Sequence, residues 1–189
     1  MGEPQARVMR WVGAALAAAA ALVAAACGGT TTLTVTQTIT RTVTRTQTTP
    51  EAAACTGDEL SGTFDVQAGS AGAGQITYTL RLENSSAACI VSGFPELQLL
   101  DAHGAALPTH AAPEPGAAPP QVRLLPGTST SYDARFSPDV PGVGEQQSGP
   151  CEATASALRV TPTGGGNLDA PISPPTPVCE QGGIRLRPS

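Results

Sequence analysis

The side chains that could act as a catalytic base include two histidines, His103 and His110. A nucleophilic triad would place one of them beside an activated serine or cysteine. The sequence has no Gly-x-Ser-x-Gly elbow that would supply such a serine. His103 lies two residues after Asp101, so both side chains could point to one side of an extended segment and either hold a metal ion or orient each other. A solvated turn is the commoner form of such a pair, and we expect one here.

The remaining polar motifs do not match a known cofactor site. Gly164-Gly-Gly-Asn167 is rich in glycine, as phosphate-binding loops are, but it lacks both a lysine and a strand-to-helix context. We interpret it as a flexible connection between strands. Four aspartates lack the spacing of a calcium-binding loop: Asp65, Asp133, Asp139 and Asp169. The sequence therefore predicts no catalytic residue, no metal and no cofactor.

Four cysteines, Cys55, Cys89, Cys151 and Cys179, lie in the C-terminal part of the chain. An even number of cysteines in an exported domain predicts disulfides. A metal site is the alternative, but no pair has the Cys-x-x-Cys spacing. Of the three possible connectivities we favour Cys55 with Cys89 and Cys151 with Cys179, because each pair flanks consecutive predicted strands. Each bridge would close a loop of about 30 residues and stabilise the fold by about 3 to 4 kcal/mol.

Cys27 follows a segment with the three parts of an export signal. Arg7 and Arg10 supply the basic start, residues 11–26 are apolar, and three alanines precede the cysteine. We predict that residues 1–26 are a lipoprotein signal peptide and that Cys27 receives lipid. The mature chain would then be anchored on the extracytoplasmic face of the cell membrane. Ala24 stands where leucine is usual, so cleavage after Ala26 without lipidation and retention of an uncleaved anchor are the alternatives.

The charge of the chain limits the classes of partner. From Cys27 onward the formal net charge is −6, and residues 55–189 carry −7. Nucleic acid and anionic lipid headgroups need a basic surface, so neither is expected as a partner.

Residues 27–54 follow the signal, with threonine at every even position from Thr32 to Thr48. Strict alternation is the period of a β-strand, whereas threonine-rich tracts that end in proline are typical of solvated stalks. The apolar positions of the alternation are interrupted by Gln37 and Arg41. We therefore favour a disordered linker over a strand.

Residues 55–189 contain short apolar runs separated by Gly, Pro, Ser and Asn. Ile76, Tyr78, Leu80 and Leu82 alternate with polar residues, which predicts a strand over residues 75–84. Further strands are expected at 62–67, 89–92, 96–101, 121–125 and 131–136, around 158–160 and around 184–186, with irregular loops at 108–120, 138–150 and 162–177. Leu125-Pro-Gly-Thr128 predicts a type II turn. Seven to eight short strands with such turns indicate an all-β fold, an antiparallel, immunoglobulin-like β-sandwich.

One stretch carries a resemblance to a known family. It runs Leu82-Glu-Asn-Ser-Ser-Ala-Ala-Cys-Ile-Val-Ser-Gly-Phe-Pro-Glu-Leu-Gln-Leu-Leu-Asp-Ala-His-Gly104 and resembles the signature of the actinobacterial domain of unknown function 4232. The Leu125-Pro-Gly-Thr128 turn, Cys151, Leu158-Arg-Val-Thr-Pro162 and Cys179 are similar to its later landmarks, and Phe94 replaces the usual tyrosine. The resemblance implies an extracytoplasmic, often lipid-anchored β-domain from Cys55 to about Pro188. It implies no activity and no catalytic residues.

These observations predict a noncatalytic binding module of the cell envelope. We expect the loops at residues 102–120 and 138–150 to contact the partner, because they are long, irregular and rich in proline. The partner would be an envelope protein or glycan, and the membrane would be contacted through the N-terminal lipid. An envelope hydrolase with an unrecognised site and a structural spacer are the alternatives.

Overall fold

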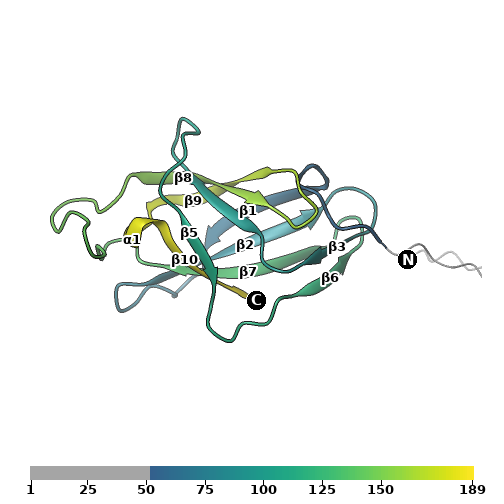
Figure 1. The fold of residues 1–189 in the computed structure, drawn as a ribbon, viewed down its shortest axis with the longest axis horizontal. Helices are drawn as coiled ribbons and strands as arrows, with labels where there is room; N and C mark the ends of the chain where they lie inside the picture. The colour runs from purple at the N-terminus through teal and green to yellow at the C-terminus, as the bar shows by residue number, and fades with distance from the viewer. Residues whose placement is uncertain (1–51) are drawn as a thin grey trace, which may run out of the picture. The chain divides into compact units, whose positions relative to one another are not determined.

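The computed structural model describes residues 52–189. Within them the chain forms ten strands, one 3-10 turn and one short α segment (Figure 1). In chain order they are η1 (Gly57–Glu59), β1 (Leu60–Val66), β2 (Ile76–Asn84), β3 (Cys89–Ser92), β4 (Glu96–Leu100), β5 (His110–Pro113), β6 (Gln121–Leu124), β7 (Ser129–Phe136), β8 (Thr154–Thr161), β9 (Leu168–Pro177), α1 (Cys179–Gly182) and β10 (Gly183–Pro188). The all-β class is confirmed, and every strand that the sequence predicted is present. None of the helical segments among these residues has the length and apolar character that crossing a membrane requires.

Eight of the strands form one sheet in the order β4-β8-β9-β1-β2-β7-β10-β5, and β3 pairs with β6 in a second, small sheet. Two pairings in the large sheet are parallel, β1 with β9 and β5 with β10. The prediction of a wholly antiparallel sheet is therefore wrong. The parallel partners are far apart in sequence, so no tight hairpin fixes their relative direction.

The large sheet curls until its two end strands, β4 and β5, come close to each other. Thr109, directly before β5, accepts a hydrogen bond at 2.9 Å from the backbone N–H of Leu99 in β4. Gln98 of β4 donates to the side chain of the same Thr109 and to the carbonyl of Leu107. These contacts make the sheet nearly barrel-shaped.

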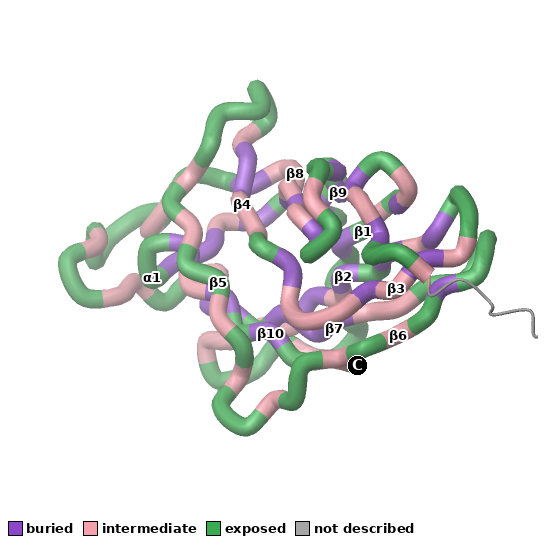
Figure 2. The backbone as a smooth tube through the Cα atoms, turned by 45° about the vertical axis from the view of Figure 1, so that its right-hand side comes forward, coloured by how far each residue is buried: buried purple, intermediate pink, exposed green. Residues whose placement is uncertain are grey.

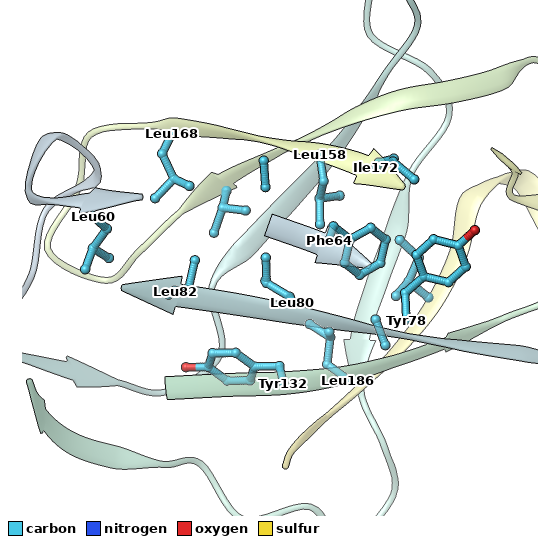
Figure 3. Packing of buried hydrophobic residues seen from close by; sticks show 14 of the residues in the cluster. Leu60, Phe64, Tyr78, Leu80, Leu82, Tyr132, Leu158, Leu168, Ile172 and Leu186 are labelled. Carbon is cyan, nitrogen blue, oxygen red and sulfur yellow. The ribbon is translucent and has the colours of Figure 1, made fainter. Parts of the chain in front are cut away.

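The core lies inside this curved sheet and follows the alternation of β2 and β7. Tyr78 is opposite Ala134 and Leu80 is opposite Tyr132, so the apolar faces of the two strands meet the same interior. Phe64 of β1 packs 5.1 Å from Tyr78 between ring centroids (Figure 3). Both tyrosine hydroxyls donate to backbone carbonyls, which satisfies their polar ends. Burial raises the pKa of Tyr132 to about 12.

Two strands, β5 and β9, lie in segments that the sequence predicted to be loops. In β9 the buried residues Leu168, Ala170 and Ile172 alternate as in any half-buried strand. The prolines hide this pattern, since proline cannot donate to a ladder and is usually confined to edges or bulges. The register between β8 and β9 shifts at Ala155 and Ala157, and this irregularity accommodates Pro174 and Pro175. The loop predictions at 108–120 and 162–177 are therefore wrong for these strands.

Exposed residues are concentrated in the connections before and after β5 and between β7 and β8 (Figure 2). The predicted type II turn is present, with Gly127 at φ 76° and the Thr128 N–H donating to the Leu125 carbonyl at 3.0 Å. The disulfides join Cys55 to Cys89 and Cys151 to Cys179, the pairs that we favoured, with Cα atoms 4.9 and 5.6 Å apart. Residues 1–26, Cys27 and most of the threonine-rich segment lie outside the described residues.

Candidate functional site

The most unusual backbone in the domain is that of α1. Glu180 has φ 57° and ψ 40°, Gln181 has φ 57° and ψ 39°, and Gly182 has φ 76°. Consecutive residues in this region form a left-handed turn, which costs about 1 to 2 kcal/mol for each residue with a side chain. Cys179 anchors the start of the turn through its disulfide and through its N–H, which donates to the Ser137 carbonyl at 2.8 Å.

The carboxylate of Glu145, in the connection between β7 and β8, holds the α1 turn. It accepts hydrogen bonds from the backbone N–H groups of Gly142 at 2.5 Å, of Glu180 at 3.0 Å and of Gln181. Successive N–H groups in such a turn form a concave anion site, which is filled here by a side chain of the same chain. These donors, above all that of Gln181, lower the pKa of the Glu145 carboxyl below its ordinary value.

The two segments that the sequence singled out as contact loops meet the α1 turn. A side chain at Gly182 would lie 1.9 Å from the carbonyl oxygen of Pro108, so the backbone of that segment rests directly on the turn. Gly142 lies in the same way against Glu180, whose Cα would be 3.0 Å from an added Cβ. Both segments that we predicted from the sequence as contact loops therefore contact the α1 turn.

Two hollows flank the α1 turn. One, of about 400 Å³, is lined by Gly142, Val143, Glu180 and Gln181. Val143 is 99% exposed, so its apolar side chain is presented to solvent. The other hollow has a volume of about 340 Å³ and lies beside β5, β7 and β10; its polar lining residues are Gln75, His110, Arg135, Glu180 and Arg185.

The pair Asp101 and His103 forms the solvated turn that we expected. The Asp101 carboxylate accepts hydrogen bonds at 2.8 Å from the backbone N–H groups of His103 and Ala105. These bonds, the one from Ala105 first, lower the pKa of Asp101. Within residues 52–189, no three His, Cys, Asp or Glu side chains gather where they could hold a metal ion.

His110 occupies a different setting, at the start of β5 and at the edge of the second hollow. The sequence offered it only as a possible base. No motif in the sequence indicated that Arg135 and Arg185 would lie near His110. These two arginines are 50 positions apart in the chain, and the pairing of β7 with β10 brings them together.

The pKa values of Glu145 and Glu152 are shifted in opposite directions from the ordinary value of a glutamate. Burial and then the charge of Glu145 raise the pKa of Glu152, whereas backbone hydrogen bonds lower that of Glu145. Divergent carboxyl pairs of this kind can divide acid and base roles in enzymes. Here the Glu145 carboxylate is bound by three backbone donors, so the arrangement holds a loop in place.

The model of one protein family, described as a domain of unknown function (DUF4232), matches residues 55–188. No curated protein and no solved structure matches the chain.

Proposed function

The chain belongs to the family of domains of unknown function DUF4232, and from that premise we propose that it is a noncatalytic binding module of the cell envelope. The observation that carries the proposal is the connection at residues 138–150, which Glu145 ties to the backbone of the α1 turn. A loop that is already ordered loses less conformational entropy when it binds. This loop therefore suits recognition of a partner.

The composition of the loop surface supports contact with a protein. Val140 is 49% exposed and Val143 is 99% exposed, and Val143 borders the hollow of about 400 Å³. Single exposed apolar residues are ordinary on a protein surface, but two on one tethered loop beside a hollow favour a contact site. The net charge of −7 over residues 55–189 favours a neutral or basic partner, since long-range charge steers encounter.

We propose a smaller contact surface than the one predicted from the sequence. Residues 102–120 include β5, which is paired with β10, so this segment is not one irregular loop. We retain residues 138–150 with Glu180 and Gln181 as the proposed contact surface. An envelope glycan is the alternative partner, and an envelope hydrolase or a structural spacer is the alternative function.

Location and finer architecture belong to the same proposal. The signal-like residues 1–26 support lipidation of Cys27 and anchoring on the extracytoplasmic face of the membrane. Two disulfides are in keeping with an oxidising compartment. We also propose that the curled sheet is a variant of the immunoglobulin-like sandwich, with β9 passing between its two layers because it pairs with both β8 and β1.

A pull-down tests the binding proposal. The full chain, purified in detergent, serves as bait in an envelope extract, and residues 138–150 are replaced by Gly and Ser in one variant. A second variant, Val143→Asp, keeps the loop and changes only its exposed apolar side chain. The matched control replaces residues 115–120, another exposed proline-rich connection.

We expect both loop variants to lose partners that the control retains. Equal capture by all three forms, each with native-like circular dichroism, would refute the loop assignment. Hydrolytic activity that disappears in His103→Ala or His110→Ala would refute the noncatalytic class.

A further inference from the structure

The second hollow, of about 340 Å³, lies on the outer face of β7, β10 and β5. Arg135 and Arg185 project from this face, because their neighbours Phe136, Ile184 and Leu186 point into the core. Ala112 and Gly183 line the same hollow and have little or no side chain. The hollow exists because small residues lie between longer charged ones.

The two arginines are directly opposite each other, as Cα partners in the β7–β10 ladder. Like charges in this position repel each other and destabilise the strand pair. Arg135 has a carboxylate partner, Glu114, at 3.2 Å. Among residues 52–189, Arg185 has no carboxylate oxygen within 4.0 Å of its guanidinium.

Half of the arginines of this acidic domain lie on this face, and two of those three are paired with a carboxylate. Of the six arginines in residues 55–189, three lie on this face: Arg135, Arg185 and Arg187. Arg187 is bound by Asp133 at 2.9 Å. Arg185 is thus the arginine of this face without a carboxylate partner among residues 52–189, and it lines the hollow together with His110, whose ring can donate an N–H.

We propose that this hollow binds a small anionic ligand through a carboxylate or phosphate group, and that Arg185 is the main residue that binds this group. A guanidinium matches the two oxygens of such a group with parallel hydrogen bonds. Arg135 and His110 complete the donor set. A volume of about 340 Å³ suits a small organic acid or phosphate ester rather than a polymer. Glu180 also lines the hollow and favours a ligand that carries a hydroxyl or amino group beside its anion.

This inference does not rest on the proposed function, because the anion-binding donors lie on strands and need no protein partner. Glu180 belongs to both surfaces, but it is not one of these donors. The test is a titration of the ¹⁵N-labelled full chain in detergent, followed by the backbone amide and arginine Nε–H signals. The probes are inorganic phosphate and succinate, each at constant ionic strength. The first tests for phosphate recognition and the second for carboxylate recognition.

We expect saturable shifts of the Arg185 Nε–H and of the Gly183 amide with at least one probe. Arg185→Gln should weaken that binding about tenfold, as expected for loss of a charge-assisted pair of hydrogen bonds. Arg123→Gln is the matched control, because Arg123 is another exposed arginine without an ion pair in the described part of the chain and lies in β6. It should bind as the wild type does.

Ala112→Leu provides a second variant, which fills the hollow and leaves every charge in place. It should weaken binding at least as much as Arg185→Gln, while the amide signals of the core strands stay unchanged. Shifts that never saturate with either probe would overturn the proposal. So would equal effects of the Arg185 and Arg123 substitutions, or undiminished binding by the Ala112→Leu protein.

Discussion

Gly182 shows how closely single residues determine the geometry of the α1 turn. Its φ of 76° lies in the left-handed region, and the carbonyl of Pro108 occupies the place where a Cβ would be. Only glycine meets both conditions without strain. Arg185 has no special backbone conformation. We propose it as an anion-binding residue because, in the described structure, no carboxylate oxygen lies within 4.0 Å of its guanidinium.

Gly182→Ala should lower the free energy of unfolding by about 2 to 5 kcal/mol, because it adds a backbone clash to the cost of a left-handed residue. The matched control is Gly104→Ala, where φ is 79° but no atom lies within 4 Å of the added Cβ. That change should cost only about 1 kcal/mol. Urea unfolding of both variants measures the difference, and equal losses would show that the contact with Pro108 is unimportant.

Among the elements, α1 and the 138–150 connection depend on each other. The left-handed turn directs two N–H groups toward one point, and the Glu145 carboxylate fills that point. The Cys151–Cys179 disulfide then joins the end of the connection to the start of the turn. Neither segment has a regular strand or a buried core of its own, so these polar and covalent links hold them.

Replacing Glu145 with alanine should lower the melting temperature at neutral pH and have no effect in strong acid. The folded-state pKa of Glu145 is depressed, so its contribution is fully present above the ordinary value of 4.5. It is lost as the pH falls through the lower, folded-state pKa. Thermal unfolding of wild type and variant at pH 7 and near pH 2 measures this.

Glu96→Ala is the control, since Glu96 is an exposed glutamate at the start of β4. It should leave the melting temperature nearly unchanged at both pH values. A difference between wild type and Glu145→Ala that persists in strong acid would show that the carboxylate charge does not hold the loop.

At the scale of the whole molecule, the proposed loop contact and the proposed anion site are neighbours that share Glu180. The 138–150 loop and α1 would contact a macromolecule, the outer face of β7, β10 and β5 would bind a small anion, and Cys27 would connect the domain to the membrane. The domain is acidic, with a formal charge of −7 in residues 55–189, and two of the three arginines on this face, Arg135 and Arg187, are paired with Glu114 and Asp133.

Membrane attachment should depend on Cys27 alone. Cys27→Ala should move the protein from the membrane fraction to the soluble fraction, because no lipid can then be attached, whereas Gly28→Ala should remain membrane-bound. Mass spectrometry of the mature N-terminus should find diacylglycerol on Cys27. An unmodified Cys27 in soluble, secreted protein would contradict the prediction.

Local patterns in the sequence were sufficient to predict the all-β class and most of the strands. In β2 and β7 the alternation of apolar and polar residues identifies both the strand and its buried face, because side chains in a strand point to opposite sides in turn. The Pro-Gly pair at 126–127 likewise specifies its turn within four residues. The family resemblance over residues 55–188 was also carried by short motifs.

Features that depend on contacts between residues far apart in the chain could be found only in the tertiary structure. β9 became a strand despite its prolines because β8 and β1 pair with it, and β5 formed as a partner of β10. The opposition of Arg135 and Arg185 comes from the register between β7 and β10. In the left-handed turn, the Glu180 N–H donates to the Glu145 carboxylate, 35 positions away. Register and long-range hydrogen bonds are properties of the assembled sheet, and no local pattern in the chain encodes them.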